Sequence, residues 1–132
     1  MKKIIFLFVF LLVGCEVNDT NYSFEEGYYS GTFIIVESDG QTLTGNVNFS
    51  FINDQYSVIP ETRYLPPVGA GMYKINLNII NITDTVPHTA EFDWTLILNG
   101  NFEFSYNDQV LTLKQNDIKH NRKRTILLTK QN

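Results

Sequence analysis

The sequence has few of the residues from which covalent and metal sites are built: it contains one cysteine and two histidines among 132 residues. A single cysteine cannot form a disulfide within the chain, so the fold must depend on its apolar core. His88 and His120 are far apart, and neither has the neighbouring ligands that a zinc site of three or four ligands needs. We therefore predict no metal and no cofactor, and we expect both histidines in solvated loops.

Catalytic motifs are also lacking. No serine lies in a G-x-S-x-G sequence, and the only thiol is that of Cys15. Glu91 and Asp93 are two residues apart, which fits a pair for acid–base chemistry, part of a calcium site, a capped corner, or a pair on a solvent-exposed face. A calcium site needs six or more oxygen ligands, which two carboxylates do not supply. No nucleophile with an activating base is present, and we therefore predict that the protein is not an enzyme.

Basic residues are few. Lys and Arg total 10, against 14 Asp and Glu. Binding to nucleic acid requires a basic stripe, so this composition argues against it. The one basic cluster, KHNRKR at residues 119–124, separates two strand-like runs. It fits either a solvated hairpin tip or a contact for an anionic partner or lipid headgroups.

Long apolar runs are absent except at the N-terminus, where the ten apolar residues 4–13 follow Lys2 and Lys3. A basic head and a short apolar run are typical of an export signal, and the run is too short to span a bilayer. LVGC at residues 12–15 resembles the lipobox of bacterial lipoproteins, in which the chain is cut before the cysteine and the thiol is diacylglycerated. The resemblance implies a signal peptide at residues 1–14 and a lipidated Cys15. A free cysteine after an ordinary signal, or an uncleaved anchor, is the alternative.

A mature chain that begins at Cys15 would lose Lys2 and Lys3, which leaves eight basic and 14 acidic residues and a net charge of −6. Two or three acyl chains anchor a protein stably, whereas this charge argues against electrostatic adhesion to anionic lipid. Residues 15–26 are polar and acidic, and we interpret them as a flexible tether. We predict a lipid-anchored protein of the cell envelope. Glu16 favours the outer membrane under the enteric sorting rule.

From Gly27 onward, apolar and polar residues alternate in short runs that are separated by turn signals such as Asp39-Gly40. Eight or nine short strands without a long crossover predict one all-β domain over residues 27–132. We favour a small antiparallel up-and-down β-barrel over a sandwich. Residues 61–70 cannot form a central strand, because Pro66 and Pro67 lack ladder donors.

The alternation also predicts which side chains fill the barrel. Seven large rings fall on the apolar face of their strands, and each buries on the order of 150–250 Å². A wall of such rings leaves little room for a deep cavity. They are Phe33, Phe49, Phe51, Tyr73, Phe102, Phe104 and Tyr106.

Three stretches resemble a family of small bacterial envelope lipoproteins with a lipocalin-like, calycin-type barrel: GTF at 31–33, GMYKI at 71–75 and TAEFDWTLILNGNFEF at 89–104. The resemblance covers nearly the whole mature chain. It implies a small β-barrel, and it implies no reaction and no catalytic residues. Asp84-Thr85-Val86 also resembles a short O-glycosylation motif of some bacterial envelope proteins, a pattern that three residues often match by chance.

Two functions stay open at this stage. The barrel would hold a small apolar or amphipathic ligand in a shallow pocket at its mouth, or it would be a packed barrel that binds an envelope protein as an adaptor, inhibitor or accessory subunit. Arg63, Tyr64 and Leu65, which precede the two prolines, are predicted contacts for the ligand or partner, as is Trp94.

Trp94 is the only tryptophan, and it lies in TAEFDWTLILNG at residues 89–100. We interpret residues 89–93 as a corner, with one turn of helix from Thr89, and expect Trp94 to plug one end of the barrel. Leu96 and Leu98 would then lead into a hairpin at Asn99-Gly100. If Trp94 is buried, Trp94→Ala should cost about 3–5 kcal/mol. If it is exposed, Trp94 becomes a binding platform.

Overall fold

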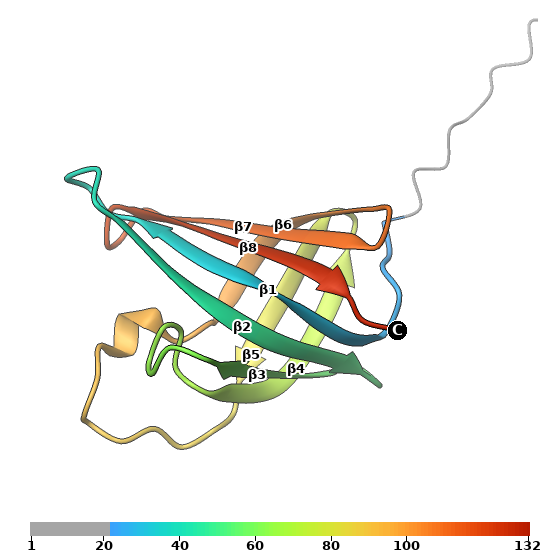
Figure 1. The fold of residues 1–132 in the computed structure, drawn as a ribbon, viewed down its shortest axis with the longest axis horizontal. Helices are drawn as coiled ribbons and strands as arrows, with labels where there is room; N and C mark the ends of the chain where they lie inside the picture. The colour runs from blue at the N-terminus through green and yellow to red at the C-terminus, as the bar shows by residue number, and fades with distance from the viewer. Residues whose placement is uncertain (1–21) are drawn as a thin grey trace, which may run out of the picture.

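The computed structural model describes residues 22–132, so the predicted signal peptide, Cys15 and most of the predicted tether lie outside the described residues. This part of the chain forms eight β-strands and one short 3-10 helix (Figure 1). The strands are β1 Gly27–Val36, β2 Thr42–Ile52, β3 Gln55–Pro60, β4 Gly69–Asn76, β5 Ile79–Asp84, β6 Gly100–Asn107, β7 Val110–Asp117 and β8 Arg122–Lys130. The helix is η1, Trp94–Leu96.

The eight strands close into an antiparallel up-and-down barrel, as the sequence predicted. Each strand pairs with the next, and β1 also pairs with β8, so the sheet has no free edge. Tight turns at 53–54 and 108–109 join neighbouring strands through residues with positive φ. Gly31 allows a close approach of β1 to β8, because a Cβ at this position would lie 1.7 Å from the carbonyl oxygen of Leu127.

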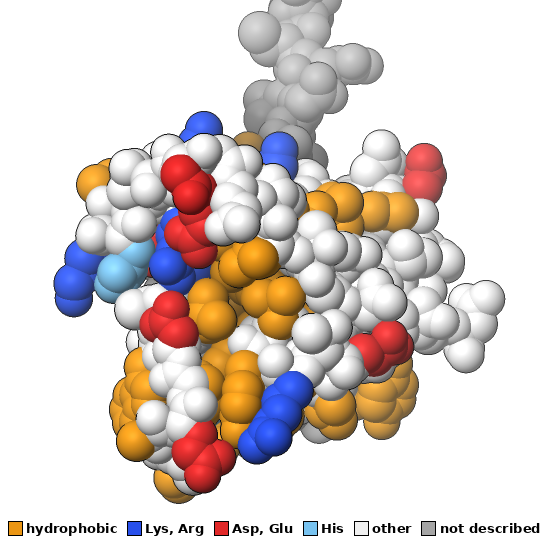
Figure 2. Space-filling model, turned by 60° about the vertical axis from the view of Figure 1, so that its left-hand side comes forward, with side chains coloured by type: hydrophobic (Ala, Val, Ile, Leu, Met, Phe, Trp, Pro, Cys, Tyr) orange, Lys and Arg blue, Asp and Glu red, His pale blue; other side chains and the backbone are white. Residues whose placement is uncertain are grey.

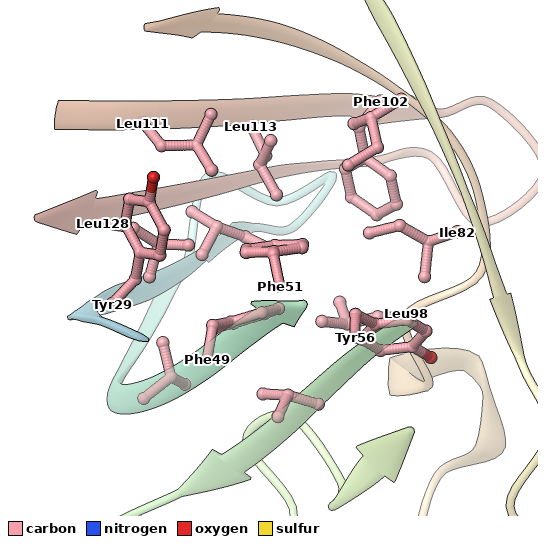
Figure 3. Close-up of a cluster of buried hydrophobic side chains, with 14 of the residues drawn as sticks. Tyr29, Phe49, Phe51, Tyr56, Ile82, Leu98, Phe102, Leu111, Leu113 and Leu128 are labelled. Atoms are coloured by element: carbon pink, nitrogen blue, oxygen red, sulfur yellow. The ribbon is translucent and has the colours of Figure 1, made fainter. Parts of the chain in front are cut away.

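Inward-facing side chains fill the barrel with one continuous cluster of buried hydrophobic residues (Figure 3). Six of the seven predicted interior rings are buried, and Tyr106 is partly buried against the cluster. The rings pack edge to face and in stacks, as between Phe49 and Phe51, whose centroids are 5.5 Å apart. The interior is therefore a packed core.

The barrel has two different ends, which we call the hairpin end and the loop end (Figure 1). The hairpin end carries the short turns at 53–54, 77–78 and 108–109, the C-terminus and the segment that enters β1. The loop end carries the longer connections: 37–41, 61–68, 85–99 and 118–121.

Phe24 closes the hairpin end. It lies within the segment that we interpreted as a tether, yet its ring is partly buried and packs against five aromatic rings of the barrel. The nearest is Phe51, at 5.1 Å between centroids, and Tyr73 stacks on it at 5.9 Å. The remaining three are Tyr29, Phe104 and Tyr106. Ordered packing thus begins before the first strand.

The prediction that Trp94 plugs a barrel end is wrong. Its side chain is 54% exposed, and the plug is Leu98, which is 1% exposed. Residues 89–93 do not form a helical turn; instead η1 begins at Trp94, and the Asp93 carboxylate caps it by accepting a hydrogen bond from the Thr95 backbone N–H at 2.9 Å. Asn99-Gly100 is not a hairpin turn, since it leads from the loop into β6.

Candidate functional site

Three aromatic side chains form a row on the loop end, which we call the aromatic ridge: Tyr64, Phe92 and Trp94. Tyr64 and Phe92 stack with centroids 4.9 Å apart and ring planes 25° apart. Phe92 and Trp94 are nearly parallel as well, with centroids 6.4 Å apart and planes 17° apart. The ridge joins two long loops, 61–68 and 85–99, that are distant in sequence.

The indole of Trp94 is held in place although it is exposed. Its Nε1–H donates to the Thr89 carbonyl oxygen at 2.9 Å, and Phe92 covers part of one face. The imidazole of His88 meets the rings of both Phe92 and Trp94 edge to face. An exposed ring with a fixed orientation loses little conformational freedom on binding, which is what a recognition surface requires.

His88, which contacts two rings of the ridge, is in turn held by the buried side chain of Asp84. His88 Nε2 lies 2.9 Å from Asp84 Oδ1, and the two side chains are only 9% and 6% exposed. The same carboxylate accepts hydrogen bonds from the Val86 backbone N–H at 2.9 Å and from the Tyr56 hydroxyl at 3.3 Å. Burial and the neighbouring Asp84 raise the pKa of Tyr56 well above its ordinary value, so the phenol stays a donor. The expectation of a solvated His88 is wrong, because Asp84 at i−4 draws it into the barrel rim.

Of the four predicted contact residues, the structure brings three to one surface. Arg63 lies over the Tyr64 ring, with Cζ 4.6 Å from its centroid, and pairs with Glu91 at 3.7 Å. That ion pair is 77% and 71% exposed, so it contributes little to stability. Trp94 joins these residues through Phe92. Leu65 instead packs inward against the core, so it is no part of this surface.

A second feature of the loop end is a network around Arg124. The guanidinium is 4% exposed although it carries a charge. It donates to Gln115 Oε1 at 3.0 Å, to Asp117 Oδ2 at 3.0 Å and to the Thr95 carbonyl oxygen, while its Nε has no partner. Burial lowers the pKa of Arg124. Since Thr95 lies in η1, this network fixes the helix on the barrel.

The predicted solvated tip at 119–124 is wrong for two of its residues. β8 begins at Arg122, and its alternation directs Arg122 and Arg124 inward. Arg122 Nε lies 3.2 Å from Glu37 Oε2, without the geometry of a hydrogen bond, and Arg122 donates to the Thr95 hydroxyl at 2.7 Å. His120 Nδ1 lies 2.8 Å from Asp117 Oδ2. These charges satisfy one another within the rim.

The barrel wall is open between β6 and β7 at the loop end. The β6–β7 ladder ends at the pair Glu103 and Lys114, so residues 100–102 and 115–117 lie outside it. The Gln115 side chain bridges the opening, because its Nε2 donates to the carbonyl oxygens of Asn99 at 3.0 Å and Asn101 at 3.4 Å. A side-chain amide thus replaces the missing backbone hydrogen bonds.

Two hollows of about 470 Å³ and about 430 Å³ lie over this opening, and together we call them the β6–β7 groove. They share Asn101, Gln115, Asn116 and Arg124 in their walls. Trp94 borders the larger one, so the groove adjoins the aromatic ridge. Figure 2 shows charged side chains of both signs, and a histidine, around exposed hydrophobic side chains on this side of the molecule.

Of the groove residues, the sequence pointed to Trp94 and to the basic cluster at 119–124, and it gave no signal for Asn101, Gln115 and Asn116. Phe92 was not predicted either. The signal for the Asp84–His88 pair was the i, i+4 spacing, and Phe92-x-Trp94 was an alternation inside the quoted stretch. Among residues 22–132 no group of three or more His, Cys, Asp or Glu side chains is placed to hold a metal ion. Over the same residues no helix is long and apolar enough to cross a bilayer.

Comparison of the chain with family models, with curated proteins and with solved structures finds no match. The features of the loop end must therefore be interpreted from their own chemistry.

Proposed function

We propose that this protein is a lipid-anchored, non-catalytic binding module of the bacterial cell envelope, and that the loop end is its binding face. The observation that carries the proposal is the aromatic ridge, in which Trp94 is 54% exposed and Tyr64 and Phe92 are partly exposed. Its rings are held in a fixed orientation at the barrel end opposite the entry of the chain. Solvent-exposed aromatic rings cost free energy in water, so a fixed row of them is typical of a recognition surface.

The packed interior supports binding on the surface rather than inside the barrel. The buried side chains form one cluster through the barrel, and the pockets of about 470 and 430 Å³ open at its wall. A small apolar ligand in the mouth of the barrel would have to displace Leu98 or Phe102, which are fully buried. We therefore favour an envelope component recognised at the loop end over an apolar molecule held in the barrel.

Arg63 strengthens the proposal that the ridge is a contact surface. Trp, Tyr and Arg are the side chains that most often dominate binding free energy at interfaces. Here Arg63, Tyr64 and Trp94 share one surface, and the Arg63 guanidinium is already ordered by Tyr64 and Glu91. Ordering before binding lowers the entropic cost of association.

The proposed attachment follows from the N-terminal sequence. A signal at residues 1–14 and a lipobox at 12–15 support cleavage before Cys15 and its lipidation. The chain enters the barrel at the hairpin end, so acyl chains on Cys15 would leave the loop end directed away from the bilayer. Glu16 supports the outer membrane as the site of attachment.

The proposal is tested by retention on isolated envelopes. The unlipidated mature chain, residues 15–132 with Cys15→Ser, is sedimented with envelopes so that acyl chains do not contribute. We expect saturable retention that falls by about tenfold or more in the variant Tyr64→Ala/Phe92→Ala/Trp94→Ala, since removal of aromatic anchors costs at least 1–2 kcal/mol. Tyr28→Ala/Leu77→Ala, which removes two exposed side chains away from the loop end, is the control and should bind like the parent.

Equal retention of the ridge variant and the parent, with circular dichroism showing that both are folded, would contradict the proposal. So would the absence of any saturable retention. A separate test addresses the anchor: the full chain expressed in bacteria with radiolabelled palmitate should become labelled, and Cys15→Ser should abolish the label, because no acyl chain can then be attached.

A further inference from the structure

We propose that the β6–β7 groove binds a pyranose ring of a saccharide chain, stacked on Trp94 and hydrogen-bonded by side-chain amides. The inference rests on the proposed function, since it names the chemical class that the loop end recognises.

The groove has the size of a small-ligand site and continues beyond one sugar ring. The hollow beside Trp94 measures about 470 Å³, within the range of about 300–1,000 Å³ that is usual for ligand pockets. The neighbouring hollow adds about 430 Å³, and its lining residues come from β5, β6, β7 and β8. Because the two hollows share lining residues and adjoin each other, they can take successive rings of a saccharide chain.

The buried charges of the groove are already paired. Asp117 is bound by His120 at 2.8 Å and by Arg124 at 3.0 Å, so neither the carboxylate nor the guanidinium is available for an opposite charge. Lys119 borders the first hollow, and Lys114 and Lys123 border the second together with Glu103. Salt screens the charges of these exposed ammonium groups. An ammonium also lacks the planar pair of donors with which a guanidinium binds a phosphate or a carboxylate.

Side-chain amides supply the remaining hydrogen-bonding groups of the groove, and several of their donors and acceptors are available to a ligand. Asn99 Oδ1 accepts from the Asp84 backbone N–H at 3.3 Å, and Asn101 Oδ1 accepts from Asn81 Nδ2 at 2.8 Å, so the donor groups of both amides are open. The Asn116 side chain lines both hollows.

Such amides match hydroxyl groups. An amide donates through nitrogen and accepts through oxygen, and a hydroxyl both donates and accepts, so each sugar hydroxyl can satisfy one. A purely apolar ligand would bury these amides without partners, which costs about 1–3 kcal/mol for each group. The lining therefore selects a ligand that is rich in hydroxyl groups over a hydrocarbon.

Trp94 provides the apolar half of the recognition. A pyranose has a face of C–H bonds, whose hydrogens carry a small positive charge and are attracted by the negative face of an aromatic ring. The indole is 54% exposed and borders the groove, and its orientation is set by Thr89 and Phe92 before any ligand arrives. Ile97 and Ile118 extend this apolar surface.

The test uses Trp94 as its own reporter, because it is the only tryptophan of the chain. The unlipidated mature chain is titrated with cellotetraose, maltotetraose, chitotetraose and trigalacturonate, and indole emission and acrylamide quenching are recorded. We expect a saturable blue shift and protection from acrylamide with at least one of these probes, at a Kd of about 1 mM or tighter. Either a neutral or an acidic saccharide that binds in this way supports the inference.

Two variants and a matched control locate the site. Asn101→Ala/Asn116→Ala should raise the Kd by about tenfold or more, since both amides would lose hydrogen bonds to the sugar. Asn76→Ala/Asn107→Ala, which removes two exposed asparagines at the hairpin end, should leave the Kd unchanged. Trp94→Ala, followed by calorimetry, should abolish the measurable heat of binding.

Three results would overturn the inference. The first is no saturable response to any of the four saccharides, and the second is an unchanged Kd in Asn101→Ala/Asn116→Ala. The third is displacement of the bound saccharide by sodium sulfate, which would reveal simple anion binding to the lysines. Its failure is distinguishable from failure of the proposed function. If retention on envelopes still depends on the aromatic ridge while no saccharide binds, only the inference about saccharides is wrong.

Discussion

Trp94 shows how far one side chain can differ from what its sequence neighbours suggest. It lies close before Leu96, Ile97 and Leu98, an apolar run that predicts burial, although Glu91 and Asp93 precede it. The 3-10 helix rotates the segment so that Leu98 enters the core and Trp94 faces outward. Because of the short helix, Leu98 and not Trp94 is the residue buried at this end of the barrel.

This exchange gives a prediction about stability. Trp94→Ala should change the free energy of unfolding by less than about 1 kcal/mol, because an indole that is half exposed leaves no buried cavity. Leu98→Ala should cost about 2–5 kcal/mol, since Leu98 is fully buried. Urea denaturation of both variants measures the difference. A larger loss for Trp94→Ala than for Leu98→Ala would show that the indole closes the barrel after all.

Asp117 makes stability depend on pH in the acid range. Burial alone would raise the pKa of Asp117, but the hydrogen bonds from His120 and the charge of Arg124 bring it below its ordinary value of 3.8. A carboxyl group whose pKa is lower in the folded state stabilises the fold above its unfolded pKa. That contribution is lost as the pH falls through the folded pKa.

The parent should therefore lose more stability than Asp117→Asn between about pH 5 and about pH 2, measured as the midpoint of urea unfolding. Asp117→Asn also leaves Arg124 without its counter-charge, so its stability should be low at every pH. Asp117→Asn/Arg124→Met restores a neutral pair and serves as the folded control. Parallel pH profiles for the parent and both variants would refute the role of Asp117.

Among the elements, the segment before β1 has a larger part than its polar composition indicates. Phe24 packs on Phe51 and Tyr73 and closes the hairpin end. Phe24→Ala should cost about 2–3 kcal/mol in urea denaturation, less than a fully buried phenylalanine, because the ring is only partly buried. Tyr22→Ala is the matched control, since Tyr22 is 42% exposed and should be nearly neutral. Equal effects of the two substitutions would place Phe24 outside the folding unit.

The strands were predictable from the sequence because a period of two is a local signal. Phe49 and Phe51 on one face of β2, with Asn48 and Ser50 on the other, specify both the strand and the side that is buried. The barrel follows from many such strands joined by short turns, since nearest neighbours can pair without crossovers. The all-β class and the closed up-and-down architecture are therefore both readable from local patterns.

The loop end was not predictable in the same way. Arg122 and Arg124 face inward because the register of β8 against β1 requires it, and that register depends on the whole barrel. Whether a charged side chain in an alternating pattern points to water or to a partner such as Asp117 depends on residues far away in sequence. The same holds for the aromatic ridge, which joins Tyr64 to Phe92 across two loops without a period.

At the scale of the whole molecule, the packed interior makes a prediction about ligands. Laurate, retinol and haem should not raise the melting temperature of the mature chain, because an apolar molecule would have to displace buried rings such as Phe49 and Phe102. Differential scanning fluorimetry with saturating ligand measures this directly. A rise of several degrees with one of them, persisting in Trp94→Ala, would place an apolar ligand in the interior.

The closeness of the start of β1 to the end of β8 has a consequence for engineering. The Gln131 backbone N–H donates to the Tyr28 carbonyl oxygen at 2.8 Å, so the C-terminus lies beside the start of the first strand. A short linker could therefore join the end of β8 to the segment before β1, and new ends could be cut in the exposed connection at residues 38–40. If the proposed lipid anchor were attached to the new start, this circular permutant would have the inverted orientation, and its aromatic ridge would face the lipid.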